Sequence, residues 1–536
     1  MPKLVSIELE NFQTLRKHVV IPISELTLLF GPNGAGKSAV FDALTLIKKI
    51  SSNEWQGDSS ELLNLFKRWA RKNNDVDDLN FGIGLSFQIP SKWGLDNHPD
   101  MFRLNKVWMS SLDNDYSNSL LNRTFRIYLK INRSIYDWSF RSIEISSDIE
   151  KILELKNDDD DNYLRIYDLD WLDFNNLERN KANFKIIKYE NGYYECPIQW
   201  DGGTPRTNQW FRTDSFPKGN FSERESIEEM ELIGQDTIHF IRGILNSEIF
   251  NETWHLVDGS RTVPTPLQTM AIAPGKIYRN SDGEIFGGHR IEESTLLINL
   301  RQSLNTQANW NQLCKEYAHH KSSSLNSQEF DQFDPIQKIN EILRDDLFEG
   351  NGYQLTGDVK CLLDFDEVEG VPDYYPSQYP KLVRLYLKDK LQNSVEIEDV
   401  GSGIGYVLPV LASLANEGAS LIQQPELHLH PKLQSALGSA IVKFIENKTY
   451  FSAFTIIETH SEHILLKIMR HVKSAKIREK EVISPLTFNK VSILYFEPVA
   501  DGSTEIRRLR LNPLGELIDR WPGGFFNERF SDYFDE

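Results

Sequence analysis

Apolar and polar residues alternate at the start of the chain, at positions 4–9 and more loosely at 19–23, as they do in β-strands. A short apolar run follows at Leu26–Phe30, which predicts a buried strand that ends at Gly31. Residues 39–50 have helical spacing and good helix formers. The pattern therefore predicts a strand, a Gly-rich loop and a helix, in the order that a phosphate-binding loop needs.

Strand-like alternation returns after residue 80 and again in the C-terminal part of the chain. The predicted strands lie at 81–87, 125–129, 138–143, 382–387, 419–422, 454–457 and 491–496. The predicted helices lie at 226–245, 292–317, 335–347, 431–446 and 462–472. No predicted helix in the middle of the chain sustains a heptad pattern for three or four turns, so a long coiled-coil arm is not expected.

The two ends of the chain are thus of α/β type, and the middle is mixed. We predict an N-terminal lobe at 1–150, an insertion of mixed α/β and helical structure at 151–380, and a C-terminal lobe at 381–536. The acidic run at 158–161 is expected to be a solvated loop.

The composition is that of a soluble globular protein. Of the 536 residues, 40% are hydrophobic and 26% are charged, and a chain of this length forms roughly two to four structural units. No apolar run is long enough to span a membrane and no apolar signal segment begins the chain, so we expect a cytoplasmic protein without a membrane partner. Three widely spaced cysteines exclude a disulfide scaffold and fit a reducing compartment.

The net charge is strongly negative, because 59 basic and 78 acidic residues give 59 − 78 = −19. Such a surface repels nucleic acid, so only a local basic patch or a partner would bring the chain to DNA or RNA. Two basic clusters are candidates for that contact, and a solvated helix face is the simpler interpretation of each. They are Lys67, Arg68, Arg71 and Lys72 beside Phe66 and Trp69, and Lys467, Arg470, Lys473, Lys476, Arg478 and Lys480.

The strongest motif follows the strand predicted at 26–30 and matches G-x-x-x-x-G-K-[ST]. Its residues are Gly31, Pro32, Asn33, Gly34, Ala35, Gly36, Lys37 and Ser38, followed by Ala39 in the predicted helix. Glycines let successive backbone N–H groups face one anion, and the helix N-terminus adds its positive dipole end. Lys37 is expected to reach the β- and γ-phosphates of ATP, and the Ser38 hydroxyl to bind Mg²⁺. The flanking strand and helix disfavour the alternative, a chance Gly-rich turn.

Three further motifs lie in the C-terminal part of the chain. Residues 399–409 read DVGSGIGYVLP, residues 421–431 read LIQQPELHLHP, and residues 456–461 read IIETHS. Together with the phosphate loop, this order resembles an ABC-type ATPase head of the SMC/OLD-like group of AAA ATPases. The resemblance implies an α/β fold whose P-loop sheet is split by the insertion. It also implies a head-to-head dimer or higher homo-oligomer that holds ATP and Mg²⁺ between its heads.

The resemblance assigns roles to residues of these motifs. His460 would be the switch histidine that senses the γ-phosphate. A signature loop would contact the γ-phosphate bound by the partner head, through Gly401, Ser402 and Gly403. Many relatives carry Ser-Gln where this chain has Gly405-Tyr406. His428 and His430 are two residues apart, as in a metal-binding pair, but the resemblance makes them structural, and we favour that interpretation.

Two amides stand where such ATPases usually carry acids. Gln423 occupies the position that helps Ser38 hold Mg²⁺, and Gln424 the catalytic position that orients and deprotonates the attacking water. A glutamine oxygen binds or orients, but it brings no charge and takes no proton. Glu426, two residues further on, is a candidate substitute. Loss of general-base help costs about 10²–10⁴-fold in rate, so we expect nucleotide binding with weak or absent hydrolysis.

The tail at 519–526 reads DRWPGGFF and is similar to an uncharacterised C-terminal module of one bacterial subset of these ATPases. The resembling stretches are 1–45, 255–265 and 380–530, and within the group they most resemble ATPase subunits of Septu-type and retron-associated anti-phage defence. Only 536 − 460 = 76 residues follow His460, too few for the Toprim nuclease of OLD-type proteins. His319 and His320 with Asn326 lack the surroundings of an HNH nuclease, so a nuclease is expected in trans.

The resemblance therefore implies an ATP-binding subunit of a bacterial anti-phage defence complex that scaffolds and regulates an HNH nuclease partner. Retron versions would add a reverse transcriptase with its RNA–DNA product. The alternatives are an ATP-hydrolysing DNA repair or recombination head, and an ABC transporter subunit. The replaced acids and the missing coiled-coil arm disfavour the first, and the altered signature and the tail disfavour the second.

Overall fold

The computed structural model describes the phosphate-loop region, most of the C-terminal half and separate strands between them. The described residues are 3–51, 79–88, 124–133, 138–148, 151–157, 162–166, 194–197, 254–266, 269–273, 278–279, 285–286, 310, 313–315, 317–318, 335–347, 352–361, 381–416, 418–448, 453–478 and 485–522. The helix predicted at 226–245, the basic cluster at 67–72 and the residues His319, His320 and Asn326 lie outside them.

A six-stranded sheet positions the phosphate loop. Its strands, in spatial order, are β10 (Trp254–Val257), β17 (Ala419–Gln423), β18 (Thr455–Glu458), β3 (Leu26–Phe30), β19 (Val491–Pro498) and β20 (Thr504–Leu509). The first five strands run parallel, and β20 is antiparallel to β19. All residues of β3 and β18 are buried, as expected for parallel strands covered on both faces.

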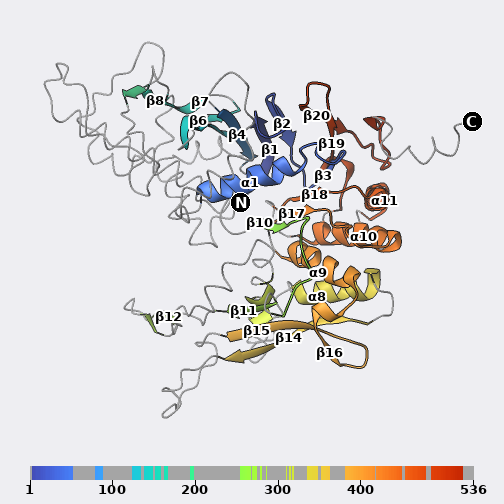
Figure 1. Cartoon of the computed structure of the whole chain (residues 1–536). Helices are drawn as coiled ribbons and strands as arrows, with labels where there is room; N and C mark the ends of the chain where they lie inside the picture. The colour runs from blue at the N-terminus through green and yellow to red at the C-terminus, as the bar shows by residue number, and fades with distance from the viewer. Residues whose placement is uncertain are drawn as a thin grey trace, which may run out of the picture.

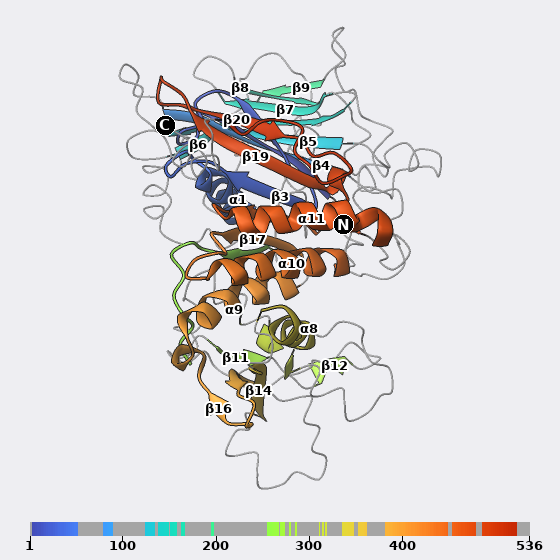
Figure 2. The same ribbon diagram turned by 90° about the vertical axis from the view of Figure 1, so that its right-hand side faces the viewer.

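Helices follow the central strands and cover the sheet. They are α1 (Ser38–Ser51) after β3, α10 (Pro431–Asn447) after β17, and α11 (Glu462–Arg478) after β18. In Figures 1 and 2, α11, α10, α9 (Ser402–Ala415) and α8 (Pro335–Ile342) lie one below another, and α9 packs against β10 and β17. Short helical turns lie at Leu343–Leu347, Ile397–Asp399 and Phe488–Lys490. No helix in the described part of the chain is long and apolar enough to cross a bilayer.

An eight-stranded antiparallel sheet lies beyond α1 and β3 (Figure 2). Its strands, in spatial order, are β2 (Val19–Pro22), β1 (Lys3–Glu10), β4 (Leu79–Gln88), β5 (Thr124–Arg133), β6 (Trp138–Ser147), β7 (Lys151–Asn157), β8 (Asn162–Ile166) and β9 (Tyr194–Pro197). At the other end lies a smaller sheet of β11 (Met270–Ala273), β15 (Lys381–Lys388) and β14 (Gln354–Cys361), with β16 (Ser394–Val395) paired to β15. A separate hairpin joins β12 (Tyr278–Arg279) and β13 (Ile285–Phe286).

Strand pairings cross the predicted domain limits at 150 and 380. β7 continues the sheet begun by β1, because it pairs with β6 across the predicted boundary. β10 belongs to the range predicted as the insertion, yet it extends the phosphate-loop sheet beside β17. β14 likewise pairs with β15, which we had placed in the C-terminal lobe. Local patterning predicted β6 and β15 but not β7, β10 or β14, and it carries no information about which distant strand a given strand pairs with.

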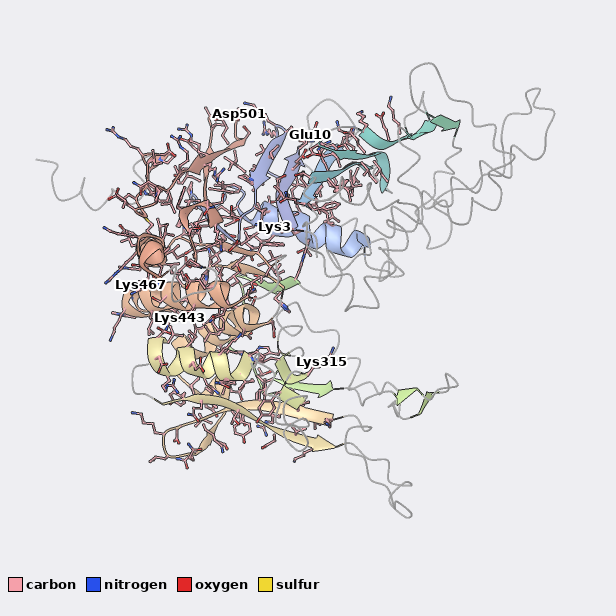
Figure 3. The ribbon with its side chains drawn as sticks, turned by 180° about the vertical axis from the view of Figure 1, so that it is seen from behind. Lys3, Glu10, Lys315, Lys443, Lys467 and Asp501 are labelled. Atoms are coloured by element: carbon pink, nitrogen blue, oxygen red, sulfur yellow. The ribbon has the colours of Figure 1, made fainter. Side chains whose placement is uncertain are left out.

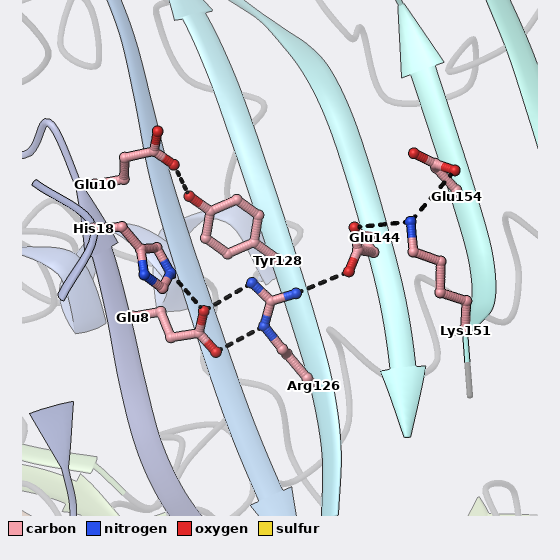
Figure 4. Close-up of polar contacts among 8 residues, drawn as sticks. All are labelled: Glu8, Glu10, His18, Arg126, Tyr128, Glu144, Lys151 and Glu154. Atoms are coloured by element: carbon pink, nitrogen blue, oxygen red, sulfur yellow. Dashed lines mark hydrogen bonds and ion pairs between the residues drawn. The ribbon is translucent and has the colours of Figure 1, made fainter. Parts of the chain in front are cut away.

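A chain of charged side chains crosses the eight-stranded sheet (Figure 4). Arg126 on β5 donates two hydrogen bonds to Glu8 on β1, at 2.7 and 2.8 Å, and one to Glu144 on β6 at 2.9 Å. His18 contacts the same Glu8 carboxylate at 2.9 Å. Burial raises the pKa of Glu8, but the hydrogen bonds from Arg126 and His18 outweigh burial and leave that pKa below its usual value. Glu8 is 5% exposed, so its charge depends on these partners.

Replacing Arg126 with Met is expected to weaken this sheet locally, by about 1–3 kcal/mol, because Glu8 loses its main partner. The pKa of Glu8 is lowered, so its contribution is present above the unfolded value of about 4.3 and is lost as the pH falls through the folded pKa. Hydrogen exchange of β4 and β5 at neutral and acid pH measures both effects. Lys17→Met, at an exposed pair with Glu505, is the control. If the stability lost in Arg126→Met is the same at acid and at neutral pH, the assignment of the effect to Glu8 is contradicted.

Candidate nucleotide-binding site

The phosphate loop joins β3 to α1 and needs glycine at two points of close approach. Gly31 has a φ of +142°, and a Cβ there would lie 2.5 Å from the Phe496 carbonyl oxygen of β19. Gly36 has a φ of +84°, and a Cβ there would lie 2.0 Å from the Thr14 hydroxyl oxygen. Both conformations favour glycine, and both positions leave no room for a side chain. The loop thus has the backbone conformation that the motif predicts.

Lys37 is folded back into the loop. Its side chain is 3% exposed, and its amino group donates to the carbonyl oxygens of Gly31 and Pro32, both at 2.9 Å. The Nζ atom also lies 3.7 Å from Oε1 of Glu458. Burial lowers the pKa of Lys37, and the Glu458 carboxylate opposes that shift. The positive charge of Lys37 therefore lies within the phosphate loop, where it would bind a triphosphate.

Glu458, to which the sequence analysis gave no role, is the carboxylate of this site. It ends β18, opposite Gln423 of β17 and Leu29 of β3 in the parallel register. Its Oε2 atom accepts from the Ser38 hydroxyl at 3.2 Å and faces the Gln423 amide nitrogen at 3.3 Å. Burial raises the pKa of Glu458, and Lys37 opposes that shift. The sequence signal that could have indicated this role is the position of Glu458 at the end of a predicted strand, because the carboxyl ends of adjacent parallel strands lie at one edge of the sheet.

Gln423 is oriented away from the metal position that the sequence analysis gave it. Its amide oxygen accepts from the Gly259 N–H at 3.2 Å, and its amide nitrogen faces Glu458. In this arrangement Gln423 orients the carboxylate of Glu458 and does not present an oxygen beside Ser38. The binding of Mg²⁺ by Gln423 stays a prediction, and in this arrangement the Gly259 N–H and the Glu458 carboxylate occupy its two polar atoms.

Gln424 lies at the same edge of the sheet. It has a φ of +47°, and its backbone N–H donates to the Glu458 carbonyl oxygen at 2.7 Å. Its side-chain oxygen lies beside Gly259, 3.5 Å from where a Cβ on that glycine would be. The role of Gln424 in orienting water stays a prediction.

Glu426 is not available as the substitute base that we considered. Its carboxylate accepts from the Thr459 hydroxyl at 2.8 Å and from the His460 N–H at 2.7 Å. Burial raises the pKa of Glu426, and these hydrogen bonds oppose that shift. Glu426 thereby ties the segment after β17 to the segment after β18. The sequence placed it two residues from Gln424, but the intervening proline directs it to another partner.

Arg261, which the sequence analysis also missed, fixes the segment after β17 from the loop that follows β10. Its guanidinium donates to the carbonyl oxygens of Gln423 at 2.9 Å, Gln424 at 3.0 Å and Tyr406 at 3.1 Å. Burial lowers the pKa of Arg261 to about 10. One side chain thus joins the strand end to helix α9, by hydrogen bonds to backbone groups that no sequence pattern reveals.

His460, the predicted switch histidine, follows β18. Its Nε2 atom is buried and has no hydrogen-bond partner among the described residues. Burial lowers the pKa of His460, and the nearby positive charge of Lys37 lowers it further. A buried ring nitrogen without a partner is costly unless a ligand satisfies it. This geometry fits a residue that contacts a phosphate oxygen.

The predicted signature loop begins helix α9. Gly401 is the N-cap residue, and both Gly401 and Ser402 are exposed, whereas Gly403 is partly buried. The first amides of a helix have no intrahelical acceptors, so this end offers N–H donors to an anion. An exposed position is what contact with a second head requires.

The departure at Gly405-Tyr406 has a packing explanation. A Cβ on Gly405 would lie 2.5 Å from Cγ1 of Val263, in the loop that carries Arg261. The Tyr406 ring lies against the His428 ring, with centroids 4.3 Å apart. His430 caps α10 by accepting from the Lys432 N–H at 3.4 Å. The two histidines therefore have the structural contacts that we favoured over a metal pair.

The basic residues of the second cluster lie on α11 or beyond it. Arg470 and Lys473 are exposed and Lys467 is partly buried, and Figure 3 places Lys467 at the outer edge of the molecule. Lys476 and Arg478 belong to the same helix, but their side chains lie outside the described residues, as does Lys480. Contact of this cluster with nucleic acid stays a prediction.

The comparisons with known proteins agree with the phosphate loop. Residues 2–465 match the AAA ATPase domain family, and the chain belongs to that family. The chain is 36% identical over 80 residues to "Structural maintenance of chromosomes protein 1" of Schizosaccharomyces pombe, and 32% over 88 residues to that of Arabidopsis thaliana. These segments are 15% and 16% of this chain, and the chain covers only 6% and 7% of those relatives.

Among solved structures, the chain is similar to an SmcHead bound to the C-winged helix domain of ScpA. The identity is 11%, the TM-score is 0.38, and the match covers 95% of this chain and 98% of the other. The family match and the parallel sheet around the phosphate loop confirm the predicted α/β ATPase fold. The chain is therefore a P-loop ATPase domain protein, and the family implies that ATP binds here.

The residues present fit Mg-ATP. Gly31 and Gly36 allow the conformation of a phosphate loop packed against Phe496 and Thr14, and Lys37 supplies the charge. The Ser38 hydroxyl and the Glu458 carboxylate are 3.2 Å apart, and both are the oxygen donors that Mg²⁺ prefers.

Gly405→Ala is expected to destabilise the protein by about 1–3 kcal/mol, because the new methyl group overlaps the stiff side chain of Val263. Thermal unfolding of the variant measures the loss. Adding Val263→Ala should relieve the overlap and recover part of the stability. Gly403→Ala is the matched control, since its Cβ would meet no atom closer than 3.7 Å. An equal loss in Gly405→Ala with and without Val263→Ala would contradict the packing explanation.

Proposed function

We propose that the chain is the nucleotide-binding ATPase subunit of a bacterial anti-phage defence complex, with slow ATP hydrolysis. The observation that carries slow hydrolysis is that the two carboxylates described beside the ends of β17 and β18 are both held in other contacts. Glu426 holds the switch loop, and Glu458 is engaged by Lys37, Ser38 and Gln423. Gln424 is left to orient water without taking its proton.

The proposed mechanism assigns one task to each residue. Backbone N–H groups of the phosphate loop and the Lys37 amino group bind the phosphates, and Mg²⁺ neutralises their charge. The Nε2 atom of His460, which has no hydrogen-bond partner among the described residues, contacts the γ-phosphate. The exposed end of α9 contacts the nucleotide of a partner head through Ser402. Nucleotide occupancy thereby favours the paired state, because both heads contribute donors to one ligand.

The proposed partner is an HNH nuclease subunit, held and regulated by the paired heads. The support is the resemblance of the tail at 519–526 and of the motif series to Septu-type subunits. In the described part of the tail, the Trp521 ring packs edge-on against Phe30 at 5.4 Å and against Tyr495 at 6.1 Å. A retron reverse transcriptase with its RNA–DNA product is a further proposed partner, and α11 is the candidate surface for nucleic acid.

An ATP-hydrolysing DNA repair or recombination head is the second candidate. The local identity to structural maintenance of chromosomes protein 1 favours it, as does the presence of a carboxylate, Glu458, in the site. The rate of ATP turnover and the identity of the proteins that co-purify with the chain distinguish the two proposals.

Gln424→Glu is expected to raise ATP turnover by at least about tenfold, because a carboxylate at this position supplies the missing general base. Steady-state phosphate release measures the change. Lys37→Ala, which removes the phosphate-binding charge, should abolish nucleotide binding in both backgrounds. A wild-type turnover of about 1 s⁻¹ or faster that disappears in Lys37→Ala would contradict slow hydrolysis and favour the repair head.

Affinity purification from the native host is expected to recover a small HNH protein with the chain, at a ratio that depends on ATP. Mass spectrometry of the eluate identifies the partner. The Lys37→Ala variant, which should not bind nucleotide, is the control for the ATP dependence. Recovery of long DNA with recombination proteins in place of a nuclease would contradict the proposed partner.

A further inference from the structure

We infer that Glu458 supplies the carboxylate that holds the Mg²⁺ of bound nucleotide, in place of the acid that β17 lacks. The inference rests on the proposed nucleotide binding and adds a residue from a neighbouring strand to that site. The negative charge is thus supplied by Glu458 on β18, and not by the residue at position 423 on the neighbouring strand β17.

The register of β17 and β18 places Glu458 directly beside the position of the missing acid. β17 and β18 are parallel, and Gln423 and Glu458 are direct partners in the ladder. Their side chains meet at 3.3 Å, with the amide nitrogen of Gln423 facing Oε2 of Glu458. The same Oε2 atom is 3.2 Å from the hydroxyl oxygen of Ser38, the residue that the phosphate-loop motif assigns to Mg²⁺. A carboxylate and a hydroxyl therefore flank one position at the start of α1.

The balance of buried charge also requires a cation at this position. Lys37 and Glu458 are 3% and 8% exposed at their side chains and lie 3.7 Å apart. When Lys37 turns to the phosphates, Glu458 loses its counter-charge while it remains buried, which is costly for a carboxylate. A Mg²⁺ ion beside Ser38 restores the balance. Glu458 would thus exchange a lysine for a metal ion when nucleotide binds.

Gln423 contributes to the same arrangement through its amide. Its oxygen is held by the Gly259 N–H at 3.2 Å, which directs its nitrogen toward Glu458. An amide donor orients a metal-binding carboxylate, whereas a second carboxylate at this distance would repel it. Gln423 on β17 and Glu458 on β18 thus act together, because the glutamine amide orients the carboxylate that binds the metal. The alternative is that Glu458 serves only as the counter-ion of Lys37, and then it affects folding but not metal.

Equilibrium binding of a fluorescent ATP analogue, with Mg²⁺ and with a chelator, tests the inference on the full chain. In the wild type, Mg²⁺ should tighten binding by about 10- to 100-fold. Glu458→Gln should remove most of this Mg²⁺ effect. Binding of the ATP analogue in the presence of the chelator should stay unchanged in this variant. The double variant Gln423→Glu/Glu458→Gln returns the carboxylate to β17 and should restore the Mg²⁺ effect. Glu505→Gln, on exposed β20, makes the same change of charge outside the site and should behave as the wild type.

The outcomes separate this inference from the proposed function. Absence of nucleotide binding by the wild type in either condition would overturn the proposed function. Equal Mg²⁺ effects in wild type and Glu458→Gln would overturn the inference and leave nucleotide binding intact. If Glu458→Gln fails to fold, the double variant is the test, because it keeps one carboxylate in the site. A folded double variant without the Mg²⁺ effect would then overturn the inference.

Discussion

The buried pair of Lys37 and Glu458 is the interaction on which the candidate site depends. Both charges are nearly removed from water, so neither is stable without the other or without a replacement. The pair joins the phosphate loop to the end of β18, and the Ser38 hydroxyl shares the same carboxylate. In the proposed binding mode the nucleotide breaks this pair, and binding is then coupled to a rearrangement of charge at the edge of the sheet.

Two further buried groups hold the surroundings of the pair in place. Arg261 binds the carbonyl oxygens of Gln423 and Gln424 and joins them to α9. Glu426 binds the Thr459 hydroxyl and the His460 N–H. The ends of β17 and β18 and the start of α9 are therefore fixed relative to one another.

The sequence predicted the elements around the phosphate loop, because a buried strand, a Gly-rich turn and a helix are each local patterns. It did not predict that β10 extends a sheet formed by distant residues, because local periodicity does not show which strands pair. Motifs predicted roles for Lys37, Ser38 and His460, and these roles stay predictions. The sequence analysis missed Glu458 and Arg261, because their roles arise from neighbouring strands and from backbone carbonyl groups.

A structure of the chain with Mg²⁺ and a non-hydrolysable ATP analogue tests the central claim most directly. The account predicts that the Lys37 amino group leaves the Gly31 and Pro32 carbonyl oxygens for the phosphates, and that the metal lies between the Ser38 hydroxyl and the Glu458 carboxylate. A metal bound without Glu458, with Glu458 still paired to Lys37, would contradict it.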